Sequence, residues 1–403
     1  MAAMVSTQVM LYRVTILGVA VLLLSACGAS KPRPDEETPV IEMEPMVLEA
    51  SGPDGDQTVR TYDAQSLFDA GRVAIGAERY DECVTQFGEL VNRFPESRFA
   101  HASLYNRGLC YEELRQHSMA AVHFQRYMEL AKTTKDLRDG EFRWGYNLVE
   151  SGSYTEAMLL YERLLKTEGL GEFDLAECYL RRGVAQLKLQ RFSEAERDFK
   201  RTMKIVETAM KGDVTGSDLA AEAHYRRGQV YFELNKNVGL KLPLERMKTD
   251  LAAKSRFFRQ SQSSFIDSLN VRNAYWATAS GLQLGSLYEQ FYLDVLKAEF
   301  PDDFDESTRE VYFLELKKYL QPLLKQSVSI YEKSITMSSR LGTSNHWVTE
   351  TESRLNKLRS LIEENARAIK AMDDAAAVED AVKKAPKKTR PKRRRRRAKN
   401  AGG

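Results

Sequence analysis

Apolar and polar positions alternate with a helical period over most of residues 62–370, and one arrangement of them recurs along the chain. A glycine lies midway along four of these helical patterns, and successive glycines are 37, 37 and 38 residues apart. Twelve residues after each glycine comes a small residue, and four residues later an aromatic one. The four sets are Gly71, Cys83 and Phe87; Gly108, Ala120 and Phe124; Gly145, Ala157 and Tyr161; and Gly183, Ala195 and Phe199. A fixed period in this range is typical of stacked helical hairpins, so the pattern predicts an all-α repeat fold.

This pattern resembles the tetratricopeptide repeat (TPR), a helix-turn-helix unit with glycine in its first helix and a small residue and an aromatic in its second. Gly228 and Gly285 continue the series, with insertions expected at 235–250 and 299–310. The resemblance implies a TPR solenoid of about five to seven repeats over residues 62–370, closed by a capping helix at 349–369. In that fold we expect the small residues to let the helices of a hairpin approach closely, and the aromatic to fill the gap between neighbouring hairpins.

The longest apolar run lies near the N-terminus, at residues 14–24. Eleven residues span about 16 Å as a helix, which is too short to cross a bilayer core of roughly 30 Å. The run ends in the sequence LSAC at 24–27, which resembles the lipobox of bacterial lipoproteins. The resemblance implies a signal peptide over 1–26 and lipidation of Cys27. Because Gly28 rather than aspartate follows the cysteine, it also implies sorting to the periplasmic face of the outer membrane.

The two flanking segments have compositions that do not support a packed core. Residues 27–61 are rich in proline and acids and lack helical periodicity, which predicts a disordered tether. Residues 371–403 are predicted to form a disordered polybasic tail. Within it, 383–399 holds twelve Lys or Arg and no acid, so the formal charge of +3 conceals a body with 48 basic and 57 acidic residues.

The basic tail suggests a partner of opposite charge. We expect an anionic periplasmic surface, such as lipid headgroups, peptidoglycan or lipopolysaccharide, or else an acidic protein. A tail that serves only solubility stays open as the alternative, and with an export signal at the other end nucleic acid is not the expected partner. The residues expected to bind the anionic surface are Lys392, Arg393, Arg394, Arg395, Arg396 and Arg397.

The sequence lacks the patterns of catalytic and metal-binding sites. Its five histidines form no metal-binding spacing with one another or with cysteine, and nucleophile-elbow, P-loop and dinucleotide-binding motifs are absent. We therefore expect no enzyme activity, no metal and no cofactor. Cys83 occupies the small-residue position of its repeat, which predicts a buried, inert thiol. A bond between Cys83 and Cys110 in adjacent hairpins is the alternative.

The candidate binding surface is the concave face that the first helices line in TPR families. Aromatic residues there suit a binding hot spot, but aromatic stripes at helical spacing also form cores, and both interpretations stay open. An arginine also precedes three of the repeat glycines, and these arginines would either bind partner carboxylates or pair with acids of the neighbouring hairpin. The residues carried over to this face are Phe68, Arg72, Tyr105, Phe142, Tyr146, Tyr225 and Phe232, with Arg107, Arg182 and Arg227 beside them.

Longer stretches resemble TPR lipoproteins of bacterial envelope machines. The segment ERYDECVTQFGELVNRFPES, at 78–97, is similar to the barrel-assembly TPR lipoprotein. The segments 273–296, 315–335 and 345–361 are similar to TPR lipoproteins of the myxobacterial gliding-motility complex. The resemblance implies a lipid-anchored periplasmic scaffold that binds envelope proteins in a motility or other trans-envelope machine. The alternatives are an assembly factor for outer-membrane proteins or secretins, and a cell-wall-linked coordinator that uses the basic tail.

Overall fold

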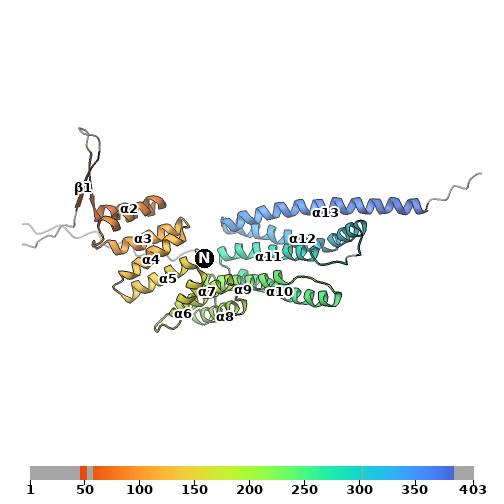
Figure 1. The fold of residues 1–403 in the computed structure, drawn as a ribbon, viewed down its shortest axis with the longest axis horizontal. Coiled ribbons are helices and arrows are strands. Elements are labelled where there is room, and N and C mark those ends of the chain that lie inside the picture. The colour runs from red at the N-terminus through yellow and green to blue at the C-terminus, as the bar shows by residue number, and fades with distance from the viewer. Residues whose placement is uncertain (1–45, 52–57, 302, 385–403) are drawn as a thin grey trace, which may run out of the picture. The chain divides into compact units, whose positions relative to one another are not determined.

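The computed structural model describes residues 46–51, 58–301 and 303–384, which contain thirteen α-helices and one β-hairpin (Figure 1). The first eight helices are α1 (Ala64–Gly76), α2 (Tyr80–Arg93), α3 (Ala100–Glu113), α4 (His117–Glu129), α5 (Thr134–Glu150), α6 (Tyr154–Leu164), α7 (Glu172–Lys188) and α8 (Phe192–Ala209). The other five are longer: α9 (Asp218–Asn237), α10 (Leu244–Asn270), α11 (Ala274–Leu296), α12 (Glu306–Leu341) and α13 (His346–Lys384).

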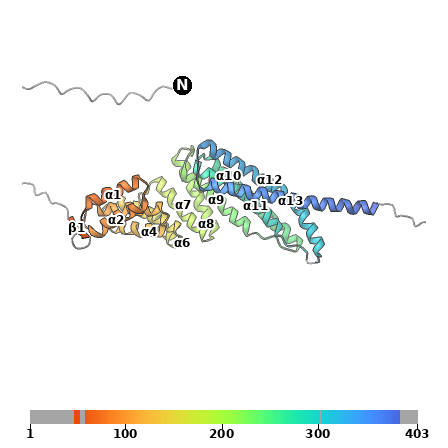
Figure 2. The ribbon, with the colours of Figure 1, turned by 90° about the horizontal axis from the view of Figure 1, so that it is seen from above.

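Helices that follow one another in the chain pack as hairpins, from α1 with α2 to α11 with α12. The final helix, α13, packs on α11 and lies beside α12 (Figure 2). The first helices of successive hairpins also touch, since α5 contacts α7, α7 contacts α9 and α9 contacts α11. The predicted all-α TPR solenoid is confirmed, with six hairpins and a final helix in the residues that the structure describes.

Each hairpin is closed by an aromatic ring of its second helix that lies on the glycine of its first helix. A Cβ added to Gly71 would lie 2.6 Å from the ring of Phe87, and one added to Gly183 would lie 2.7 Å from the ring of Phe199. Only glycine leaves room for the ring, so the two backbones approach closely. The ring thus lies on the glycine of its own hairpin, and Phe87 and Phe124 also share core clusters with Cys110 and Trp144 of the following hairpin, so the expectation that the aromatic fills the gap between hairpins is met in part. The six rings are all fully buried: Phe87, Phe124, Tyr161, Phe199, Phe265 and Tyr331.

In the last two hairpins the glycine and its ring lie much further apart in the sequence. The spacing is 16 residues in the first hairpin, but 37 between Gly228 and Phe265 and 46 between Gly285 and Tyr331. The insertions expected at 235–250 and 299–310 account for only part of the difference, because α9 to α12 are themselves longer than the helices of the first hairpin. The contact between glycine and ring is thus kept while the rest of the hairpin lengthens.

A buried lysine fixes the link between α9 and α10. The side chain of Lys254 is fully buried, and its Nζ donates to the carbonyl oxygen of Asn235 at 2.7 Å. The same Nζ forms an ion pair with Asp294 of α11 at 2.6 Å. A buried charge is tolerated when it is paired and hydrogen-bonded, so Lys254 ties the end of α9 to the next hairpin.

The tether expected over 27–61 contains ordered structure in the part that is described. Strand β1 (Met46–Ser51) pairs antiparallel with β2 (Thr58–Asp63), with Val47 opposite Tyr62. Val47 and Tyr62 also pack against the core of the first hairpin, which explains why this stretch folds despite its polar composition. Asp63 then caps α1 by accepting a hydrogen bond from the backbone N–H of Ser66 at 2.7 Å.

The last helix is longer than the predicted capping helix at 349–369. It continues to Lys384, so the polybasic tail that was expected from 371 begins with helix. Alanine-rich sequence over 375–377 has high helix propensity, and Asp373 pairs with Lys318 of α12 at 3.1 Å. These two features extend the helix beyond the point where charge patterning alone predicted its end.

The cysteines correct one prediction. Cys83 and Cys110 form a disulfide between α2 and α3, with Cα atoms 6.4 Å apart. The default interpretation of Cys83 as a free, inert thiol is therefore wrong, and the alternative of a bond between adjacent hairpins is correct. Cys178 is free and buried, and burial raises the pKa of its thiol to about 12, so it is unreactive.

Replacing Gly71 with alanine should lower the free energy of unfolding by about 1–3 kcal/mol, because the new methyl group meets the buried ring of Phe87. Gly76 is a matched control in the same helix, since a Cβ built there meets nothing within 4 Å. Gly76→Ala should be neutral, or stabilising by up to about 1 kcal/mol. Denaturant titration followed by circular dichroism measures both, and equal effects of the two substitutions would contradict this account of the hairpin contact.

Candidate functional site

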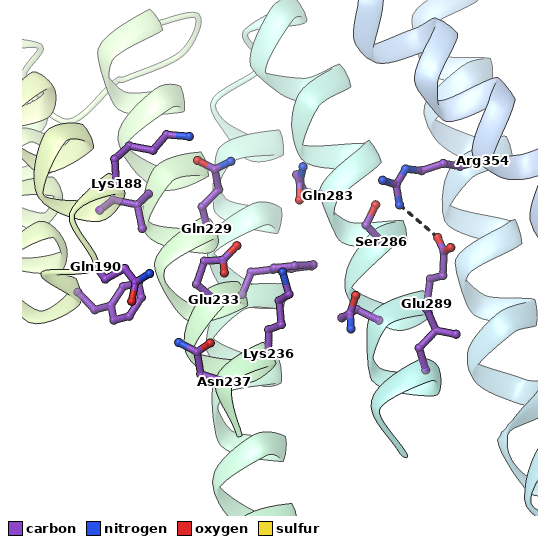
Figure 3. Close-up of a pocket in the computed structure, with 15 residues that line it drawn as sticks. Lys188, Gln190, Gln229, Glu233, Lys236, Asn237, Gln283, Ser286, Glu289 and Arg354 are labelled. Carbon is purple, nitrogen blue, oxygen red and sulfur yellow. Dashed lines mark ion pairs between the residues drawn. The ribbon is translucent and has the colours of Figure 1, made fainter. Parts of the chain in front are cut away.

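A cleft lies between α7, α9 and α11, and one residue of α13 closes it (Figure 3). Its volume is about 560 Å³, within the range of roughly 300–1,000 Å³ that is usual for ligand sites. Leu187, Phe232 and Leu293 supply apolar surface. We call it the amide cleft after the five side-chain amides that line it: Gln190, Gln229, Asn237, Gln283 and Gln290.

The amides are held in place by neighbours on the same helices. Arg226 donates to the Oε1 of Gln229 at 3.1 Å, and the Nε2 of Gln229 donates to the Tyr225 hydroxyl at 3.2 Å. The Nε2 of Gln290 donates to Asp294 at 2.7 Å. A side-chain amide has two N–H donors and a carbonyl acceptor, so each keeps further hydrogen-bonding capacity. The cleft can therefore both donate to and accept from a ligand.

The charged groups of the cleft nearly balance. Lys188, Lys236 and Arg354 line it together with Glu233 and Glu289. Arg354 on α13 pairs with Glu289 on α11 at 3.5 Å, and this ion pair forms one wall (Figure 3). Burial would lower the pKa of Arg354, but hydrogen bonding to Glu350 and the charge of Glu289 raise it. Such a mixed lining favours a polar ligand without a large net charge.

A buried charge network continues from the cleft along α9. Glu222, Arg226 and Gln229 follow one another at spacings of four and three residues, so they lie on one face of the helix. Glu222 is 1% exposed and accepts from Arg181 of α7 at 3.1 Å and from Arg226 at 3.0 Å. Burial raises the pKa of the Glu222 carboxyl, but Arg181 and Arg226 outweigh it and hold that pKa below its usual range. The network fixes α7 against α9 next to the cleft.

The predicted groove aromatics do not share one place. Phe232 lines the amide cleft, whereas Tyr225 is 1% exposed and packs in the core with its ring 5.1 Å from that of Trp276. Phe142 packs half-buried against a core cluster. Tyr146 is half-buried, with the guanidinium of Arg181 5.5 Å from its ring centre.

The two aromatics nearest the N-terminus pack in inter-helix contacts. Phe68 lies 4.9 Å from the ring of Phe99, and Tyr105 lies 5.4 Å from that of Phe124. Both are half-buried. The structure therefore brings one of the six predicted aromatics to the cleft and places the others between helices or in the core.

The predicted arginines also lie at different places in the structure. Arg182 makes a bidentate ion pair with Asp198 of α8, at 2.7 and 2.9 Å, within its own hairpin. Arg107 lies over Tyr111 and Arg227 over Tyr231, each on its own helix, and Arg72 is exposed on α1. None of the four lines the amide cleft.

The adjacent arginines, Arg181 and Arg226, form the network beside the cleft instead. A shift of one residue turns a side chain by about 100° around a helix, which explains the difference.

The cleft amides were not predicted. Gln229 directly follows the repeat glycine Gly228, and Gln283 lies two residues before Gly285. Gln283 interrupts the otherwise apolar first half of α11, and this is the signal that would have indicated a polar groove.

Several expectations fall outside the described residues. They are the signal peptide at 1–26, the lipidation site Cys27, and the basic run from Lys392 to Arg397. Among the residues that are described, no group of three or more His, Cys, Asp or Glu side chains is arranged to hold a metal ion. The helices that the structure describes include none long and apolar enough to cross a membrane.

No protein-family model matches this sequence, and no curated protein matches it. Among solved structures, the chain is similar to the apo form of RapI at 12% identity, with 77% of this chain and 100% of that chain covered and a TM-score of 0.42. It is also similar to the C-terminal part of a TPR repeat-containing protein from Cytophaga hutchinsonii, at 13% identity, 75% and 99% coverage and a TM-score of 0.40. A tetratricopeptide repeat protein from Parabacteroides merdae matches at 13% identity, 73% and 98% coverage and a TM-score of 0.35. At this identity the likeness concerns the fold alone.

Removing the carboxylate of Glu222 should destabilise the chain strongly. Glu222→Ala leaves the buried guanidinium of Arg181 without its main partner, which costs about 3–5 kcal/mol in unfolding free energy. The control is Glu194→Ala, which removes an exposed pair with Arg191 and should cost no more than about 1 kcal/mol. Denaturant titrations of both variants give the comparison. A loss at Glu222 as small as that at Glu194 would show that the network is not needed for stability.

Proposed function

We propose that this TPR-repeat chain is a scaffold of the cell envelope, attached through a lipidated Cys27 to the periplasmic face of the outer membrane, that binds envelope proteins in a gliding-motility or other trans-envelope machine. The observation that carries the proposal is the amide cleft, which is open, polar and lined by the first helices of successive hairpins. Its occupant is an extended segment of a partner protein. The amide cleft binds this segment and does not catalyse a reaction on it.

The chemistry of the cleft favours a peptide segment. Every peptide unit of an extended chain offers one N–H donor and one C=O acceptor, and Gln229, Gln283 and Gln290 can satisfy both kinds of group. Phe232 and Leu293 offer apolar surface for side chains. The nearly balanced charges of the lining would tolerate partner segments of varied sequence.

The described residues also favour binding over catalysis at this place. The lining contains neither histidine nor cysteine, and its serine hydroxyl, on Ser286, lies 3.1 Å from the hydroxyl of Tyr331 rather than beside a base. A nucleophile needs an adjacent base to be activated. We therefore assign the cleft to recognition.

The compartment is supported by the cysteines. A disulfide between Cys83 and Cys110 persists in an oxidising compartment such as the periplasm, and is rare where glutathione and thioredoxin keep thiols reduced. This agrees with the lipobox resemblance at Cys27. The two features lie in different parts of the chain and point independently to export.

The link to a motility machine rests on where the resemblance falls. The segment 273–296, similar to gliding-motility TPR lipoproteins, covers the whole of α11. Gln283, Ser286, Glu289 and Gln290 of that helix form one wall of the amide cleft. The part of the sequence that carries the resemblance is thus also part of the candidate binding site.

Cys27→Ala should release the protein from membranes, because the substitution removes the thiol that lipidation needs. Fractionation of cells into inner membrane, outer membrane and soluble periplasm, followed by immunoblotting, measures this. Cys178→Ala is the control, since its buried thiol has no part in anchoring and the variant should stay with the outer membrane. Continued recovery of the Cys27→Ala protein in outer membranes would refute the lipid anchor.

A photo-crosslinking residue placed at Glu233, in the amide cleft, should capture a partner protein in living cells. The double variant Gln229→Ala/Gln283→Ala should reduce the captured product about tenfold, equivalent to about 1.4 kcal/mol, because two neutral hydrogen bonds are lost. Gln326→Ala, an exposed amide on α12, should have no effect.

Mass spectrometry of the captured product tests the assignment directly. Capture of a gliding-motility or trans-envelope protein supports the proposal. Capture of a secretin or a barrel-assembly protein would instead indicate that the chain is an assembly factor. Undiminished capture by the double variant would show that the partner does not bind in the amide cleft.

A further inference from the structure

The link between α11 and α12 carries a cluster of aromatic rings at the surface, which we call the α11–α12 tip (residues 297–301 and 303–313). Phe300 lies 5.4 Å from Phe313 and 6.3 Å from Phe304, and Phe304 lies 5.8 Å from Tyr312, measured between ring centres. All four rings are only half-buried, and the neighbouring side chain of Val311 is 49% exposed. Aromatic surface left open to water in this way indicates an interaction site.

The tip is also acidic. The carboxylates of Glu299, Asp303, Glu306 and Glu310 are exposed around the rings. Asp305 is occupied as the N-cap of α12, where it accepts from the backbone N–H of Thr308 at 2.7 Å. The surface thus combines aromatic faces with negative charges, and this combination repels anionic lipid and selects a cationic partner.

The tip already holds one guanidinium. The Arg309 side chain lies over Phe300, with 5.2 Å between the guanidinium carbon and the ring centre. Arginine stacks on aromatic faces and pairs with carboxylates through its planar fork, so it satisfies both features of the tip at once. An arginine-rich segment is therefore the kind of partner that fits the tip.

This chain supplies such a segment close by. Helix α13 runs antiparallel to α12, as shown by the pairs Arg359–Glu332 at 2.7 Å and Asp373–Lys318 at 3.1 Å. From the Asp373–Lys318 pair, α13 continues for eleven residues to its end at Lys384. Because the helices are antiparallel, α12 runs in the same direction for twelve residues to its start at Glu306, which belongs to the tip. The 19 residues that follow, 385–403, contain ten Lys or Arg and no acid. For comparison, the average end-to-end distance of a random-coil chain of 19 residues is about 25 Å.

We propose that residues 385–403 dock on the α11–α12 tip of the same chain, through arginine stacking on Phe300, Phe304 and Tyr312 and ion pairs with Asp303, Glu306 and Glu310. The interaction is intramolecular and salt-sensitive, because it depends on exposed charges. A docked tail is unavailable to other anionic surfaces until such a surface displaces it. This inference needs only the charges and rings described, and it does not depend on the partner of the amide cleft.

Carbodiimide cross-linking of the full chain tests the docking, because this reagent joins lysine amines to carboxylates in contact. Unlabelled and ¹⁵N-labelled chains are mixed in equal amounts, cross-linked and mapped by mass spectrometry. We expect Lys387, Lys388 or Lys392 to be joined to Asp303, Glu306 or Glu310, with both peptides from one isotopic form. The yield should fall several-fold between about 50 mM and 500 mM NaCl.

A matched pair of variants isolates the aromatic part. Phe304→Ala keeps every carboxylate of the tip and should reduce the tail-to-tip yield at least threefold. Phe173→Ala removes an exposed ring on α7 and should leave the yield unchanged. Tail lysines joined to acids throughout the chain without preference for the tip would overturn the proposal. So would links found only between isotopic forms, which would show that the tail of a second copy occupies the tip.

Discussion

The contact between a repeat glycine and a buried aromatic ring sets the distance between the two helices of every hairpin. Six glycines each receive one ring from the following helix, and all six rings are fully buried. The spacing in sequence varies from 16 to 46 residues, but the contact itself does not change. Interior packing density leaves no space for a further methyl group, so this contact fixes hairpin geometry more firmly than loop length does. The helices that line the amide cleft are positioned by it.

Neighbouring hairpins are joined by polar contacts in addition to the apolar clusters that run across them. Arg181 on α7 reaches Glu222 on α9, Lys254 on α10 reaches Asp294 on α11, and a disulfide joins α2 to α3. Buried charges are costly unless they are paired, so these contacts form only when the hairpins stack in one register. Polar pairing between hairpins therefore adds a fixed register to the apolar packing that runs along the solenoid. The first helices carry polar groups as well as apolar ones, and the amide cleft is built from them.

The sequence was sufficient for the fold and insufficient for the site, and the reason is physical. A glycine, a small residue and a ring at constant spacing depend only on helix geometry, so Gly71, Cys83 and Phe87 already predict a hairpin. Whether Arg181 or Arg182 reaches Glu222 of the next hairpin depends on a rotation of about 100° that repeat counting does not resolve. The pairing of Cys83 with Cys110 depends on how two hairpins stack, and the hairpin at 46–63 depends on contacts of Val47 and Tyr62 with a core distant in sequence. Features set within one hairpin were predictable, whereas features set by contacts between hairpins were at best one of several alternatives.

The polar character of the amide cleft has a consequence for how tightly it binds. Neutral hydrogen bonds each contribute only about 0.5–1.5 kcal/mol net, and the apolar surface contributed by Phe232 and Leu293 is small, so a single partner segment of the proposed kind would bind with modest affinity. Under the proposed anchoring, scaffold and partner share one thin layer of the envelope, where the effective concentration of a tethered partner reaches the millimolar range. A weak, sequence-tolerant cleft is then sufficient for assembly and still allows exchange. Anchor and cleft are therefore complementary, since attachment to the membrane supplies the proximity that the cleft chemistry lacks.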